Sequence, residues 1–91
     1  MDSITVKPFW KLFANLPLEI KSLSKVTYKT WKENPSHPSI HFEKIKSIKK
    51  HNAYSVRIGL NYRALSYVEN STAYWFWIGS HEEYNKIIKG Q

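Results

Sequence analysis

The segment from Ala53 to Val68 constrains the fold more than any other part of the chain. In "AYSVRIGLNYRALSYV", nearly every second residue is apolar on both sides of a Gly-Leu-Asn turn signal. This period of two is typical of β-strands. A three-residue loop makes the segment a hairpin in which Arg57 and Arg63 lie opposite each other on one face. Because like charges directly opposite destabilise a sheet, the pair predicts a face built to hold an anion.

Length and composition indicate one globular domain, residues 1–91. The chain has 91 residues, 42% of them hydrophobic, and no cysteine. This length leaves no room for a second core. The absence of cysteine excludes thiolate zinc sites and cysteine nucleophiles. The start "MDSITVKPFW" has no secretory signal pattern and no segment approaches the length of a membrane span, so we expect a cytoplasmic protein without membrane association.

Charge is the clearest global signal of a partner. Fourteen Lys and Arg against seven Asp and Glu give a net charge of +7. A strongly basic domain favours a nucleic acid, an acidic protein segment or an anionic membrane surface. The alternative is that the charge serves solubility alone.

The N-terminal third predicts a helical hairpin. Phe9, Leu12, Phe13 and Leu16 have the spacing of one apolar helix face. Pro8 suits the first turn of that helix. Pro17 ends it and opens a second helix that continues to about Glu33.

The rest of the chain predicts a sheet and a final helix. A weak edge strand is expected from Ile40, the hairpin follows it, and the apolar run 72–79 reads as a strand buried in mid-sheet. Ser80 and Glu83 have the spacing of a capping box, which predicts a short C-terminal helix. The expected fold is α+β, with helices packed on one face of a three- to four-stranded antiparallel sheet.

Four residues are candidates for chemistry. An arginine presents a planar fork of donors matched to phosphate oxygens, so Arg57 and Arg63 together could clamp a phosphate. His81 and Tyr84 are three residues apart and share a face of the last helix. An imidazole can take or give a proton near neutral pH, and a phenol ring can also stack on a base. The alternatives are exposed arginines, a helix-capping histidine and a tyrosine that closes the core.

A basic segment follows the expected edge strand. Lys44, Lys46, Lys49 and Lys50 could track a nucleic-acid backbone, or could form a solvated edge that discourages aggregation. His37 and His41 have a helical ligand spacing, but prolines argue against a helix there. We therefore expect no metal site and no cofactor.

The order of these residues resembles the RelE/ParE superfamily of small bacterial toxins, the toxic halves of type II toxin–antitoxin modules. The resemblance is carried by "NPSHPSIHFEKIK", "YSVRIGLNYRAL" and "WFWIGSHEEY", and it covers most of the chain. It implies a compact sheet with a helical hairpin. It also implies a cognate antitoxin as partner. RelE-type members are metal-independent endoribonucleases that cut mRNA, many of them in the ribosomal A site.

Site residues are implied by the same resemblance. Arg63 matches the sheet arginine that stabilises the scissile phosphate, and Arg57 matches a supporting basic position. Tyr84 matches the residue that takes the proton of the attacking 2′-hydroxyl. His81 stands where several members have arginine, and Ser55 stands where some have a further lysine. His41 or Lys46 could compensate for that missing charge as RNA-binding residues.

Three functions remain open from the sequence. The leading one is an mRNA interferase, an RNA-cutting toxin whose partners are the mRNA, the ribosome and the antitoxin. The second is a ParE-like inhibitor of DNA gyrase, and the third is a catalytically inactive nucleic-acid-binding relative. The full set of basic residues with Tyr84 favours RNA cleavage, because ParE-type members typically lack it.

Overall fold

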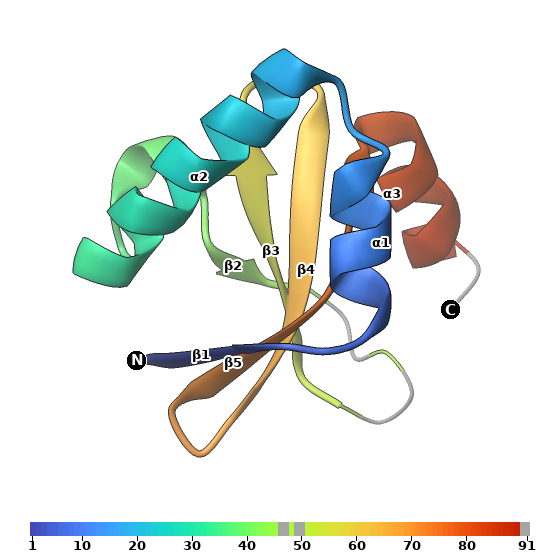
Figure 1. The fold of residues 1–91 in the computed structure, drawn as a ribbon. Coiled ribbons are helices and arrows are strands. Elements are labelled where there is room, and N and C mark those ends of the chain that lie inside the picture. Colours follow the sequence, from blue (N-terminus) through green and yellow to red (C-terminus); the bar gives the residue numbers. More distant parts are fainter. Residues whose placement is uncertain (46–47, 49–50, 90–91) are drawn as a thin grey trace.

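The computed structural model describes residues 1–45, 48 and 51–89. Figure 1 shows the chain as a curved sheet with helices on both of its sides. In chain order, the elements are β1 (Asp2–Thr5), α1 (Pro8–Ala14), α2 (Leu18–Glu33), the 3-10 helix η1 (Pro38–Ile40), β2 (Glu43–Lys44), β3 (Ala53–Ile58), β4 (Tyr62–Glu69), β5 (Thr72–Ser80) and α3 (His81–Lys89).

The sheet has five strands in the order β1-β5-β4-β3-β2. The three neighbouring pairs from β5 to β2 are antiparallel, as predicted. The first strand, β1, adds a parallel edge beside β5, so the sheet is mixed. The sequence did not predict β1, because four residues that pair with a strand some 70 positions away carry too little periodicity.

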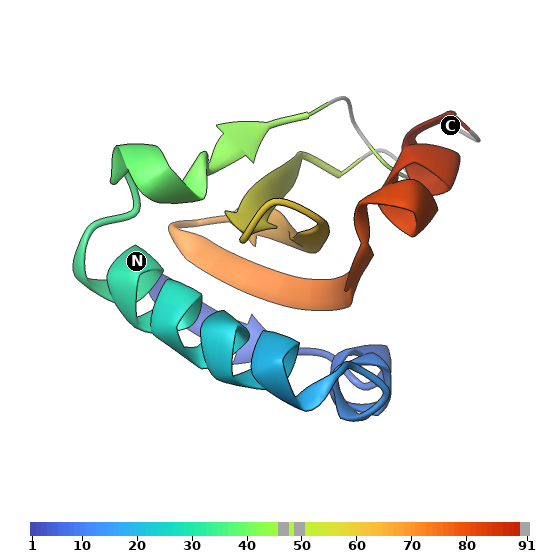
Figure 2. The same cartoon turned by 90° about the horizontal axis from the view of Figure 1, so that it is seen from above.

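The predicted helical hairpin is confirmed. Proline 8 opens α1, and α2 begins directly after Pro17. Both helices lie on one side of the sheet (Figure 2). Under them, the buried Trp31 of α2 meets Trp75 of β5 edge-on, with ring centroids 5.2 Å apart. We call this side the helical-hairpin face.

A β-bulge in β5 changes which residues face the helical hairpin. Leu65 pairs with Trp77 and Ser66 pairs with Trp75, so Phe76 is an extra residue on β5. Trp75 and Ile78 consequently belong to the core under the hairpin, whereas Phe76 and Trp77 pack on the opposite side. An extra residue of this kind shifts the alternation of a strand by one position.

The last helix, α3, corrects the expectation that all helices share one face. Tyr84 and Ile87 of α3 pack against a second cluster that contains Ala53 and Leu65, on the face opposite the helical hairpin. The predicted capping box is confirmed. The Glu83 N–H donates to Ser80 Oγ at 3.2 Å, and Glu83 Oε1 accepts from the Ser80 N–H at 3.2 Å.

The strand expected from Ile40 begins later. Pro38 starts η1 instead, where the His37 ring accepts a hydrogen bond from the Ser39 N–H, so Ile40 is helical. A two-residue strand, β2, then forms the edge of the sheet next to β3. The edge position was predicted and is confirmed.

Candidate functional site

Arg57 and Arg63 are directly opposite residues of the β3–β4 hairpin. The loop between the strands is Gly59 to Asn61, as the sequence predicted. Both side chains are on the face opposite the helical hairpin, because their neighbours Ile58 and Ala64 belong to the core beneath α1 and α2. The hairpin therefore holds two guanidinium groups at one register position of one face.

Neither guanidinium is neutralised by a carboxylate of the described chain. Among residues 1–45, 48 and 51–89, the ion pair found within 4.0 Å joins His41 and Glu43 at 3.8 Å. Arg63 Nη1 donates to the Tyr62 carbonyl at 2.8 Å. Arg57 Nε is buried and has no hydrogen-bond acceptor in the described residues. An unpartnered buried donor is costly, so Arg57 reduces the stability of the free protein at this position.

The surroundings of Arg63 lower the pKa of its guanidinium below the ordinary value. Burial contributes most, the positive charge of Arg57 contributes next, and Tyr84 acts in the opposite direction. Both leading causes disfavour positive charge at this point, and a bound anion would relieve both. The effect of Tyr84 also places its ring within electrostatic reach of Arg63.

The hairpin loop is tied to the start of α3. The Asn61 carbonyl accepts a hydrogen bond from the His81 N–H at 2.7 Å. His81 and Tyr84 share a face of α3, with ring centroids 6.2 Å apart and ring planes 30° apart. The capping box of Ser80 and Glu83 fixes the same first turn. The four predicted residues therefore come together at one end of the sheet.

This arrangement combines an anion clamp with two proton-transferring groups. The guanidinium forks of Arg57 and Arg63 can hold oxygens of a phosphate and balance added negative charge in a transition state. His81 and Tyr84 supply an imidazole and a phenol beside it. Together these groups suit acid–base chemistry at a phosphate ester.

Of the other predicted RNA-binding residues, the two that the structure describes, Lys44 and His41, are not part of this cluster. Lys44 is exposed on β2 and pairs with Tyr54, whose ring stacks on Phe42 on the helical-hairpin side. His41 precedes β2 and contacts Glu43. Lys46, Lys49 and Lys50 lie outside the described residues.

Two further residues, Gly79 and Trp77, shape the site without having been singled out from the sequence. On β4, Arg63 lies between two cross-strand partners, which are Arg57 of β3 and Gly79 of β5. A Cβ atom at Gly79 would lie 2.6 Å from Cζ2 of Trp77, so the indole covers the place where a side chain would be. Ser55, where some relatives carry lysine, is buried on β3. In the sequence, the glycine before Ser80 in "WIGSH" is the one signal that could have suggested the close packing of the Trp77 ring over Gly79.

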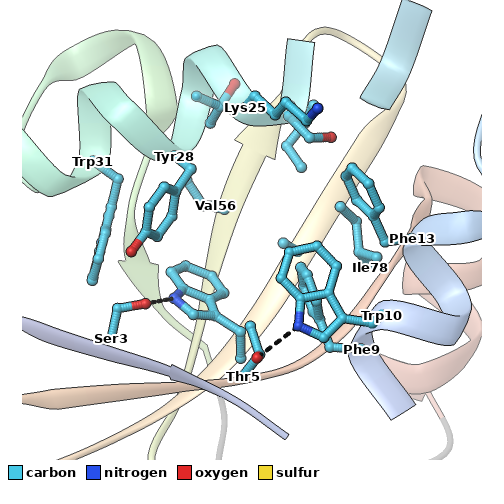
Figure 3. Close-up of a pocket in the computed structure, with 15 residues that line it drawn as sticks. Ser3, Thr5, Phe9, Trp10, Phe13, Lys25, Tyr28, Trp31, Val56 and Ile78 are labelled. Carbon is cyan, nitrogen blue, oxygen red and sulfur yellow. Dashed lines mark hydrogen bonds between the residues drawn. The ribbon is translucent and has the colours of Figure 1, made fainter. Parts of the chain in front are cut away.

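A second concave surface lies on the helical-hairpin face. It is a groove of about 390 Å³ between α1, α2 and β1. Trp10 and Tyr28 stand at its mouth and Lys25 lies on its rim (Figure 3). Trp10 is 56% exposed and Tyr28 is 45% exposed, which is unusual for large aromatic side chains. This aromatic groove is separated from the arginine pair by the thickness of the sheet.

Two classes of feature do not occur in the described part of the chain. Residues 1–45, 48 and 51–89 contain no group of three or more potential metal-ligating His, Cys, Asp or Glu side chains. Within the same residues, none of the helices is both long and apolar enough to cross a bilayer.

Solved structures share this fold. The RelB–RelE antitoxin–toxin complex of Methanococcus jannaschii is similar with a TM-score of 0.72 and 23% identity, covering 91% of this chain and 95% of that one. The RelE–RelB complex of Pyrococcus horikoshii has a TM-score of 0.67 and 15% identity, with 87% and 92% covered. The isolated RelE toxin of E. coli has a TM-score of 0.63 and 15% identity, with 98% and 96% covered.

Sequence comparison gives the family. No curated protein matches the chain significantly. The family model of the ParE-like toxin domain matches residues 21–86, which include the arginine pair, His81 and Tyr84. The resemblance inferred from the sequence is thereby confirmed, and the chain belongs to the family of the ParE-like toxin domain.

Proposed function

We propose that this toxin is a metal-independent endoribonuclease that cleaves mRNA. The observation that carries the proposal is the convergence of Arg57, Arg63, His81 and Tyr84 at one end of the sheet, with no carboxylate of the described chain paired to either arginine. A gyrase inhibitor needs no such combination of an anion clamp and proton-transferring groups.

The proposed reaction is attack by a ribose 2′-oxygen on its own 3′-phosphorus. The new O2′–P bond forms as the P–O5′ bond breaks, leaving a 2′,3′-cyclic phosphate and a free 5′-hydroxyl. The Tyr84 oxygen takes the proton from the 2′-hydroxyl, and the His81 ring gives a proton to the departing O5′. Arg57 and Arg63 hold the non-bridging oxygens, whose negative charge increases in the transition state.

The partner we propose is an antitoxin that carries an acidic amphipathic helix. Related toxins were solved in complex with RelB antitoxins, and the aromatic groove is a concave, mostly apolar surface of about 390 Å³ on this chain. Apolar side chains of such a helix would fill the space between Trp10 and Tyr28, and its carboxylates would pair with Lys25 and the other α2 lysines. An antitoxin bound in this groove would not contact the arginine pair, which lies on the opposite face of the sheet.

The proposal is tested in a ribosome-programmed translation mixture. Purified wild-type protein is added, and the ends of the mRNA are mapped by primer extension, beside Arg63→Ala and Tyr84→Phe. We expect discrete cuts with the wild type and a steep loss in both variants. Intact mRNA in this mixture, together with inhibition of gyrase in a DNA-supercoiling assay, would instead support the alternative of a ParE-like gyrase inhibitor.

A further inference from the structure

Leu60 is the most exposed large hydrophobic residue of the described chain, at 83%. It is the central residue of the three-residue β3–β4 loop, and three positions separate it from Arg57 on one side and from Arg63 on the other. We propose that Leu60 is a wedge that unstacks the RNA base next to the phosphate held by the two arginines. This inference rests on the proposed RNA cleavage and assigns a positioning residue to it.

The loop that carries Leu60 is held on both sides. Gly59 has φ of +60°, and a Cβ added there would lie 2.9 Å from Cδ2 of Leu23 on α2. Asn61 accepts the 2.7 Å hydrogen bond from the His81 N–H. A loop packed against α2 at one residue and hydrogen-bonded to α3 at another holds the backbone of its central residue in place. The backbone of Leu60 is therefore already ordered in the free protein, and little conformational entropy is lost there when RNA binds.

Leu60 is also at the right place. A strand advances about 3.3 Å per residue, so the Cα of Leu60 lies within about 10 Å of the Cα of either arginine. With its own side chain added, Leu60 reaches a nucleotide adjacent to a phosphate bound between Arg57 and Arg63. The first residue of α3, His81, also adjoins this loop, because its N–H donates to the Asn61 carbonyl.

The chemistry explains why an apolar wedge is useful there. Attack of the 2′-oxygen in line with the P–O5′ bond needs a backbone geometry that a continuously stacked strand does not have. Leucine is among the apolar side chains that proteins insert between bases to unstack them. Unstacking a nucleotide costs free energy, and a preformed wedge offsets this cost through contacts made only when RNA is bound. A leucine serves this purpose without offering a stacking surface of its own.

Leu18 provides a matched control. It is 80% exposed and has the same side chain, but it belongs to the first turn of α2 and not to the arginine hairpin. If exposed leucines served only general adhesion to the ribosome or to a partner, Leu18→Ala and Leu60→Ala would have similar effects. The wedge predicts different effects.

The experiment uses ribosomes programmed with a short mRNA whose codon in the empty ribosomal A site carries 2-aminopurine. The fluorescence of this base rises when it is unstacked. Binding is followed in a Tyr84→Phe background, and single-turnover cleavage is followed with Tyr84 intact. We expect the fluorescence rise with the parent chain, Leu18→Ala and Leu60→Met. We expect Leu60→Ala to lose the rise, to cut about tenfold more slowly, and to bind with an affinity within about threefold of the parent.

The outcomes separate the two proposals. A chain with Leu60→Ala that keeps both the fluorescence rise and the cleavage rate overturns the wedge and leaves RNA cleavage standing. A loss of affinity equal to the loss of rate also overturns it, because Leu60 would then be a general contact. A wild-type chain that cuts no mRNA overturns the proposed function and the wedge together.

Discussion

Arg57 and Arg63 face each other across β3 and β4 as a directly opposed pair. In a sheet, this placement of like charges opposes folding. The burial of Arg63 and the unpartnered Nε of Arg57 add to the cost. The absence of a carboxylate partner in the described chain supports our proposal that the pair binds an anion.

Removing one arginine should therefore stabilise the free protein. Arg57→Met keeps an unbranched apolar stem and removes both the repulsion and the orphaned donor. We expect the free energy of unfolding to rise by about 1 kcal/mol in low salt, measured by urea denaturation. Added inorganic phosphate should bind the wild type selectively and so reduce the difference between the two free energies of unfolding. A less stable Arg57→Met would show that Arg57 makes a structural contact.

The hydrogen bonds of the capping box should stabilise the protein more than the negative charge of Glu83 does. Glu83→Ala removes the acceptor for the Ser80 N–H and hydroxyl, whereas Glu82→Ala removes an acidic residue of the same helical turn. Both lose a favourable charge at a helix N-terminus, so their difference isolates the capping box. We expect Glu83→Ala to be less stable than Glu82→Ala by about 1 kcal/mol in thermal denaturation. Equal stabilities would mean that the first turn of α3 is fixed by other contacts.

Gly79 should not tolerate a methyl group. In Gly79→Ala, the new carbon would overlap the Trp77 ring at 2.6 and 2.8 Å from two of its atoms. We expect a loss of about 1–3 kcal/mol in the free energy of unfolding, together with reduced mRNA cleavage, because Gly79 adjoins Arg63. Trp77→Leu combined with Gly79→Ala should recover part of the loss. A neutral Gly79→Ala would show that the indole moves away at little cost.

The aromatic groove should carry antitoxin affinity and not catalysis. Trp10→Ala removes an exposed ring at the mouth of the groove. We expect it to weaken binding of the co-encoded antitoxin by about 2 kcal/mol or more in calorimetric titration, and to leave mRNA cleavage unchanged. Leu18→Ala, a comparable loss of exposed apolar surface outside the groove, is the control. Unchanged affinity in Trp10→Ala would place the antitoxin on another surface.

Local patterns predicted the parts of the fold whose signals are local. Alternation and a turn signal were sufficient for the β3–β4 hairpin and its register. Apolar spacing and two prolines were sufficient for α1 and α2. In contrast, β1 depends on pairing with β5 far along the chain, and the bulge at Phe76 lies within a run that is apolar on both faces. Neither leaves a periodic signal, and the side of the sheet on which α3 packs depends on that bulge.

The candidate site was predictable to a similar extent. The opposition of Arg57 and Arg63 followed from the hairpin, and the shared face of His81 and Tyr84 followed from helical spacing. The bond between Asn61 and His81, which joins these two halves, is a backbone contact and has no sequence signature. The role of Gly79 depends on how the Trp77 ring folds over it, which only the structure shows.

The most direct measurement replaces a single oxygen atom in the RNA. Once the cut position is known, the same mRNA is prepared with a 2′-deoxy sugar at the nucleotide 5′ to the cut, and both are presented to the wild-type protein. We predict that the unmodified RNA is cut to a 2′,3′-cyclic phosphate and that the deoxy-substituted RNA resists cleavage at that position. Cleavage of the deoxy-substituted RNA at the same position would contradict attack by the 2′-oxygen and the roles given to Tyr84 and His81.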